Sequence, residues 1–144
     1  MHCVATIAPP RSTALTAAKV TLAVAAVYNI VFGAWAVLLP ASAFELAGLD
    51  QPNYPELWQC IGMIVGVYGI GYAIAARDPI RHWPIVLVGL LGKILGPIGF
   101  LGAVLQDRVP LSASLIIVTN DLIWWPGFGI ALWLAWHAHR DGTA

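Results

Sequence analysis

Long apolar runs separated by short polar segments dominate this chain. A bilayer has a hydrocarbon core about 30 Å thick, which a helix crosses with about 20 mostly apolar residues. Four runs meet this length, and they cover residues 20–39, 57–76, 84–105 and 111–136. Only Lys93 and Asp121 interrupt them with a charge. Because the backbone of a span must satisfy its own hydrogen bonds in lipid, each run is predicted to be a helix.

The pattern predicts a single domain over residues 1–144, an all-α integral membrane four-helix bundle. Prolines and charges mark the ends of the runs, with Pro40 after the first run and residues 107–110 between the third and fourth. One further short helix is expected around residues 41–47, where Gly48 would stop it. The short alternating segments of a membrane β-barrel do not occur.

The distribution of Lys and Arg predicts the orientation. Cytoplasmic ends of spans carry an excess of these residues. Arg108 alone lies at one side of the predicted spans, whereas the other side carries Arg11, Lys19, Arg77, Arg81 and Arg140. We therefore expect both ends of the chain to lie inside. The acidic loop over residues 40–56 would then face outside.

A cleavable signal peptide is the competing interpretation of the first run. Arg11, the apolar run and the small residues 41–43 resemble one. However, the apolar part of a signal peptide is usually about 7–15 residues long, and this run is longer. Tyr28 and Asn29 also lie in its middle. Cleavage would leave three spans with the new N-terminus outside.

Composition agrees with a lipid-facing surface. Hydrophobic residues make up 60% of the chain and charged residues 10%, whereas a soluble domain usually carries about 25% charged residues. The net charge is zero, so nothing draws the chain to nucleic acid. The predicted partner is the lipid bilayer, and a bacterial inner (cytoplasmic) membrane fits best because outer membranes hold barrels. No cofactor is predicted, and Cys3 and Cys60 are expected to be free thiols.

Lys93 and Asp121 are the sharpest chemical signal. A charge at the centre of a bilayer costs at least about 2.5–3.5 kcal/mol, so charged residues in spans usually pair or carry function. Both lie near the middle of their predicted spans, which run in opposite directions. Since spans joined by a short turn are normally neighbours, an ion pair between the two is expected. Such a pair either fixes the helix register or forms part of a relay or a binding site.

Other polar groups lie at the same predicted depth. Asn29 lies in the middle of the first run, and Asn120 precedes Asp121. Prolines lie close by as well, and each removes the backbone donor for the carbonyl four residues earlier. Pro97 thus frees the carbonyl of Lys93, with a kink expected in that helix, and Pro126 frees that of residue 122. The predicted binding or relay cluster consists of Asn29, Lys93, Asn120, Asp121, Trp124 and Trp125.

The two tryptophans belong to this cluster because their N–H groups need partners inside a membrane. Core packing, with an N–H bonded to the polar cluster, is one interpretation of Trp124 and Trp125. The alternative is that they stack on an aromatic or quinone-like ligand.

Glycines spaced three and four residues apart predict faces for close helix packing. The glycines of these faces are Gly62, Gly66, Gly69, Gly89, Gly92, Gly96 and Gly99. Packing within the bundle is one reading. A homo-oligomer or a membrane-protein partner on these faces is the other.

The histidines do not predict a metal site. His2, His82, His137 and His139 all fall at the predicted inner boundary, and they lack nearby carboxylates other than Asp78 and Asp141. No metal ligands are therefore assigned. No nucleophile motif, phosphate loop or dinucleotide fingerprint occurs either.

The whole chain resembles uncharacterised small bacterial four-helix membrane proteins, including DoxX-like ones in a loose sense. The likeness rests on size, on topology and on the segment from Thr119 to Pro126. The small multidrug exporters share the four-span size. Their membrane-embedded glutamate in the first span is absent here, where Asn29 stands, so proton-coupled drug export does not carry over.

Three functional hypotheses follow. The first is a non-enzymatic accessory or binding subunit, in which Lys93 and Asp121 touch inside a closed bundle. The second is a small proton- or ion-coupled carrier or channel, which requires a water-accessible cavity. The third is a membrane enzyme acting on lipid or quinone, which requires a lateral opening near Asp121 and the two tryptophans.

Overall fold

The structure, a computed structural model, describes residues 11–142 and is helical throughout its regular parts. Its long helices are α1 (Arg11–Leu38), α3 (Pro55–Arg77), α4 (Trp83–Val104) and α6 (Trp125–Arg140). The short ones are α2 (Ser42–Ala47), η1 (Leu111–Ala113), α5 (Ser114–Asn120) and η2 (Leu122–Trp124). Cys3 and His2 lie outside the described residues.

The four predicted runs all coincide with helical segments that are long and apolar enough to cross a membrane. The second and third runs differ from α3 and α4 by one or two residues at each end. The first is part of a longer helix, since α1 already includes Arg11. The short helix expected around residues 41–47 is α2, and Gly48 ends it with a left-handed backbone at φ 66°.

The fourth run departs from its prediction, because it is not one helix. Helix α5 ends at Asn120, and Asp121 has a non-helical backbone with φ −122° and ψ −63°. One 3₁₀ turn, η2, follows before α6 begins at Trp125. Pro126 lies in the first turn of α6, where its missing N–H costs nothing. By contrast, α4 continues through Pro97 without a break.

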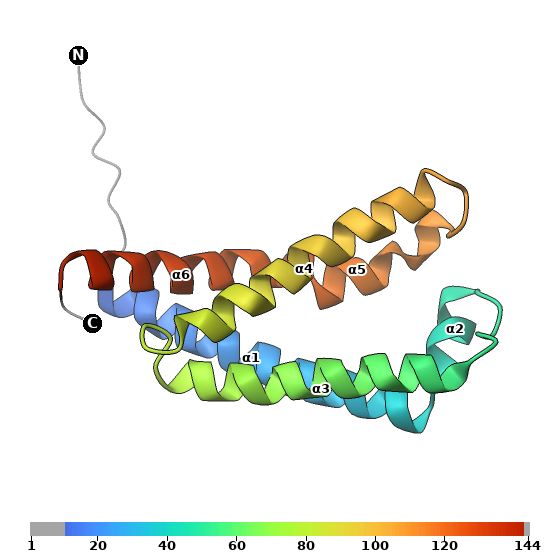
Figure 1. Cartoon of the computed structure of the whole chain (residues 1–144), viewed down its shortest axis with the longest axis horizontal. Coiled ribbons are helices and arrows are strands. Elements are labelled where there is room, and N and C mark those ends of the chain that lie inside the picture. Colours follow the sequence, from blue (N-terminus) through green and yellow to red (C-terminus); the bar gives the residue numbers. More distant parts are fainter. Residues whose placement is uncertain (1–10, 143–144) are drawn as a thin grey trace, which may run out of the picture.

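All four long helices pack together only in one half of the molecule. Helix α1 lies antiparallel beside α3 and also contacts α6, and α4 contacts α6 (Figure 1). The core of buried side chains belongs to this half. It includes the edge-to-face pair of Tyr72 and Phe128, whose ring centroids lie 5.0 Å apart. The described ends of α1 and α6 lie together here.

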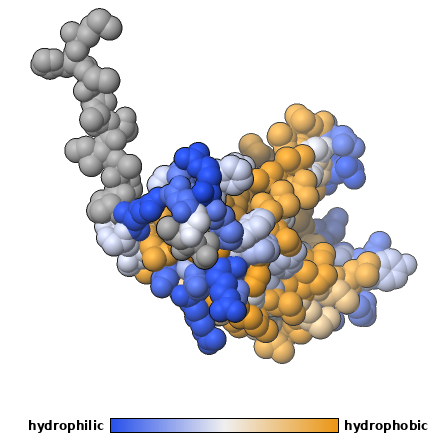
Figure 2. Space-filling view, turned by 60° about the vertical axis from the view of Figure 1, so that its left-hand side comes forward, coloured by the Kyte–Doolittle hydropathy of each residue, from blue (hydrophilic) through white to orange (hydrophobic). Residues whose placement is uncertain are grey.

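The other half is splayed. Helices α4 and α5 form one arm, which diverges from the arm made by α2 and the adjoining parts of α1 and α3 (Figure 1). The closed bundle that the first functional hypothesis requires is therefore present in one half of the molecule and open in this one. The surface of both arms is apolar, and the hydrophilic residues gather at the ends of the molecule (Figure 2).

Candidate functional site

Lys93 of α4 is buried against the break in the fourth span, with 4% of its surface exposed. Its Nζ donates a hydrogen bond to the backbone carbonyl of Asn120. The rings of Tyr72 and Trp124 lie 5.8 and 5.9 Å from the ammonium. The charge is therefore held by a carbonyl dipole and two aromatic faces.

The expected ion pair between Lys93 and Asp121 does not form. Among the described residues, one salt bridge occurs, and it joins Arg11 to Asp141. The reason lies in the break after Asn120. There the N–H of Trp124 bonds to the carbonyl of Asp121, so the carbonyl of Asn120 loses its helical donor. The ammonium takes that carbonyl instead of the carboxylate.

Side chains satisfy two other carbonyls that the helix irregularities free. The indole N–H of Trp124 donates to the carbonyl of Thr119 at 2.9 Å. Trp125 donates its indole N–H to the carbonyl of Lys93 at 3.1 Å, which Pro97 deprives of its helical partner. Trp124 is buried and Trp125 is 39% exposed. Both indole N–H groups are thus bonded as the packing interpretation expects, but of the two rings Trp124 alone belongs to the buried core.

Asp121 is also buried, with 6% of its surface exposed. Its Oδ1 accepts a hydrogen bond from the side-chain amide of Asn120 at 3.1 Å. Its Oδ2 faces Gly96 so closely that a Cβ on that glycine would lie 3.0 Å away. Gly96 therefore leaves room for the carboxylate. Oδ2 has no hydrogen-bond partner among the described residues.

A cavity of about 240 Å³ lies beside these groups. Helix α3 contributes most of its apolar wall, including Ile61, Ile64 and Val65, and two tyrosines. The polar residues that line it are Asn29, Tyr68, Tyr72, Lys93, Asn120 and Asp121. The four predicted cluster residues Asn29, Lys93, Asn120 and Asp121 therefore meet at one cavity, although they come from three separate helical segments.

Two amide oxygens in the cavity wall have no partner. The Oδ1 atoms of Asn29 and Asn120 are buried and accept no hydrogen bond from the residues that the structure describes. Asn29 is 3% exposed. An unsatisfied buried acceptor costs about 1–3 kcal/mol, so such groups mark places where a ligand or water binds.

Tyr68 and Tyr72 are the polar residues of this site that the sequence pattern did not single out. Tyr72 is 2% exposed, and its ring lies so close to Gly89 that a Cβ added there would come within 2.5 Å of it. The sequence feature that could have revealed them is the spacing of Tyr68 and Tyr72, which puts both hydroxyls on one face of α3. They follow Ile61 and Val65 on that face.

The glycines of the predicted faces have three kinds of surroundings. Gly62 and Gly69 pack against α1, where they meet atoms of Ala36 and Ala26, and Gly33 of α1 packs against Gly62 and Gly66. In α4, Gly89 and Gly96 make room for Tyr72 and Asp121. A Cβ on Gly66, Gly92 or Gly99 would meet nothing within 4 Å.

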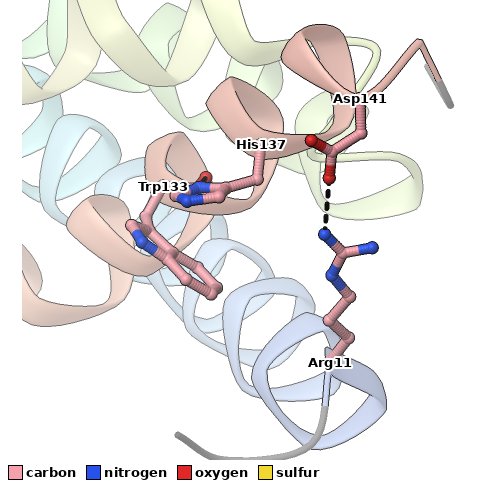
Figure 3. A network of polar contacts seen from close by, with 4 residues as sticks. All are labelled: Arg11, Trp133, His137 and Asp141. Atoms are coloured by element: carbon pink, nitrogen blue, oxygen red, sulfur yellow. Dashed lines mark hydrogen bonds and ion pairs between the residues drawn. The ribbon is translucent and has the colours of Figure 1, made fainter.

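The far end of the molecule holds a separate polar group near the chain ends. Arg11 pairs with Asp141 at 2.8 Å, beside His137 and Trp133 (Figure 3). His137 and His139 each bond through Nδ1 to a carbonyl of their own helix. Among residues 11–142, no three metal-binding side chains gather. Cys60, in contrast, is an exposed thiol on α3.

Comparisons with known proteins do not identify a family for this chain. No family model matches the chain, and no curated protein or solved structure is similar to it. The resemblance to small bacterial four-helix membrane proteins stays a prediction.

Proposed function

We propose that this chain is a multi-pass protein of a bacterial inner membrane and serves as a binding module centred on Lys93 and Asp121. Both chain ends would lie in the cytoplasm, where the Lys and Arg excess belongs. The large apolar side chains that cover the helices support a lipid-facing surface. Val31, Leu95 and Val67, for example, are all more than 60% exposed.

One observation carries the binding role. Lys93 and Asp121 are both buried beside a cavity, yet they do not neutralise each other by direct contact. Two charges inside a membrane are costly unless each is well paired. A bound molecule that contacts both groups would offset this cost, so the absence of the direct contact expected from the sequence favours a ligand between the two groups.

Native mass spectrometry tests the proposal. The protein is extracted in mild detergent from a bacterial inner membrane. We expect it to carry a small molecule, or a partner protein, that Lys93→Met and Asp121→Asn lose. Asp107→Asn is the matched control. It changes a carboxylate far from the cavity, at a backbone φ of 52° that Asn tolerates. Wild-type protein without any added mass would contradict the proposal.

A small carrier is the second candidate, and the broken fourth span favours it. Many transporters bind substrates at discontinuous helices near the bilayer midplane. Here Asn120 and Asp121 lie at such a break and line the cavity. Alternating access of a Gly92→Cys variant to membrane-impermeant thiol reagents from both sides would favour this candidate. Access from one side only, in every condition, would count against it.

A further inference from the structure

The polar end of the cavity offers both hydrogen-bond donors and acceptors. The Lys93 ammonium has donors left after its single bond to Asn120. Asp121 Oδ2 and the Tyr72 hydroxyl have no hydrogen bond to any described residue, and both residues line the cavity. A hydroxyl is the smallest group that can accept from Lys93 and donate to Asp121 at once.

The charges of the site restrict the head group further. One ammonium and one carboxylate line the cavity, so their charges cancel. A ligand with a net charge would leave an uncompensated charge deep among the helices, which is unfavourable in a membrane. The head group that fits therefore carries no net charge.

A second cavity lies next to the first, and it is apolar. It measures about 170 Å³ and lies between the two arms of the splayed half. Its walls come from α2 and α3 on one side and from α4, η1 and α5 on the other. The residues that line it are Ala43, Phe44, Leu49, Trp58, Phe100, Val109, Ala113, Ile116 and Ile117.

The helix positions show that the two cavities are stacked. Trp58 of the apolar cavity lies one turn from Ile61 of the polar one, and Ile117 lies one turn from Asp121. Phe100 is two turns from Lys93 on the same face of α4. Trp58 to Tyr68 spans ten residues, or about 15 Å of helix. Figure 2 shows the notch between the apolar arms at this end.

The polar cavity is reached from the side of the molecule. Ile61 and Ile64 of α3 line it and are 48% and 57% exposed. Gly92, on the facing side of α4, is exposed too. The mouth therefore lies between α3 and α4, on a surface that would face lipid.

From these observations we infer that the site binds a lipid-soluble alcohol, with an uncharged hydroxyl head and an apolar tail. This inference rests on the proposed binding function and names its ligand class. The hydroxyl lies between Lys93 and Asp121, within reach of Tyr72. The tail extends past Trp58 into the apolar cavity. The ligand enters from the bilayer between α3 and α4.

Binding to the protein in nanodiscs, with empty nanodiscs as the baseline, tests the head group. The probes are 4-decylphenol, 4-decylanisole and farnesol. The anisole carries the same tail and ring but has no O–H donor. We expect 4-decylphenol to bind about tenfold more tightly than 4-decylanisole, the usual effect of one well-placed hydrogen bond. Tight farnesol binding would identify an aliphatic alcohol, and preference for the phenol an aromatic one.

Two glycines of α4 test the position of the site. Gly92 lines the polar cavity, and a Cβ added there would meet no atom within 4 Å. The same holds for a Cβ at Gly99, which does not line that cavity. We expect Gly92→Leu to abolish 4-decylphenol binding. Gly99→Leu, the matched control, should leave it unchanged.

The tail is tested at Ala113, which is buried and lines the apolar cavity. Ala113→Leu should weaken 4-decylphenol about tenfold while 4-ethylphenol binds as before. Retained 4-ethylphenol binding also shows that the variant folds.

Two results would overturn the inference. One is equal affinity for the phenol and the anisole, and the other is phenol binding that Gly92→Leu leaves intact. If native mass spectrometry finds another bound molecule and none of the three probes binds, the ligand class is wrong while the binding function stands. If the wild type carries nothing and binds no probe, both fail.

Discussion

Lys93 and Trp125 each supply the hydrogen bond that the other's segment lacks. The Lys93 ammonium donates to a carbonyl at the break in the fourth span, and Trp125 donates to the Lys93 carbonyl that Pro97 leaves free. The first bond ties α4 to the end of α5, and the second ties it to the start of α6. Unpaired backbone groups are expensive inside a membrane, so these side chains stabilise both irregular segments.

Replacing Lys93 should therefore weaken the fold as well as the site. Lys93→Met keeps a long apolar chain but leaves the Asn120 carbonyl without its donor. We expect the free energy of unfolding to fall by about 0.6–2 kcal/mol, the range for hydrogen bonds between membrane helices. Titration with SDS, followed by circular dichroism, measures it. Lys19→Met, which removes a lysine that has no such bond, should change stability less; equal losses would contradict the role of Lys93.

At this scale the sequence predicted which polar residues meet but not how they bond. Burial of Asn29, Lys93 and Asp121 follows from the cost of charged and amide groups in apolar runs. The expected ion pair was wrong because it assumed that the fourth span was one helix. Once the backbone breaks at Asp121, a free carbonyl competes for the ammonium, and no charge pattern reveals that.

At the scale of elements, α1 and α3 form the closest helix pair. Gly33 lies so near α3 that a Cβ there would be 2.5 Å from the carbonyl oxygen of Gly62. Backbone atoms cannot move aside, so small residues are what permits this contact. The Gly62–Gly66 motif predicted close packing correctly, but Gly33 in the partner helix has no motif of its own.

Gly33→Ala and Gly66→Ala form a matched pair for this contact. The first must push the helices apart and should lower the free energy of unfolding by about 1–3 kcal/mol, as overpacking does. The second adds a methyl group to open space and should be neutral or slightly stabilising, since Ala favours helix. Thermal unfolding in detergent compares them. Similar losses for both would show that the contact is looser than described.

The break in the fourth span had a signal in the sequence. Proline is common in the first turn of a helix, so Pro126 indicates a helix start near Trp125 as readily as a kink. Pro97 does not mark a helix start, because α4 continues through it. Trp125 donates the hydrogen bond that the carbonyl of Lys93 loses to Pro97. Proline alone does not distinguish the two cases. The distinction depends on which side chains of other segments reach the freed carbonyls.

At the scale of the whole molecule, the four apolar runs were predictable because length and hydropathy decide them. The splayed arms were not predictable. Lipid tails are as apolar as leucine, so membrane helices separate easily where small or polar residues do not hold them together. Small side chains of α1 such as Ala26 and Gly33 contact α3, whereas a Cβ added at Gly99 or Gly102 in the outer part of α4 would meet nothing within 4 Å.

Cysteine labelling tests the orientation of the whole chain. In a background without Cys3 and Cys60, a Gln51→Cys variant should react with a membrane-impermeant maleimide on intact spheroplasts. Ser12→Cys and Arg140→Cys should react only after the membrane is opened, because the Lys and Arg excess keeps those ends inside. Labelling of Ser12→Cys on intact cells would show the opposite orientation. Labelling of Ser12→Cys and Arg140→Cys on opposite sides would reveal an odd number of spans.

Because of the break at Asp121, α6 should respond to a pulling force separately from the rest of the chain. Continuous helices resist extraction along their whole length, but α6 is joined to the rest of its span by one 3₁₀ turn. Pulled from the C-terminus by an atomic force microscope tip, α6 should come out as a single step. Its 16 residues correspond to about 55 Å of extended chain. In the proposed membrane topology, extraction would then stop at the hydrogen bonds that the side chains of Lys93 and Trp124 donate.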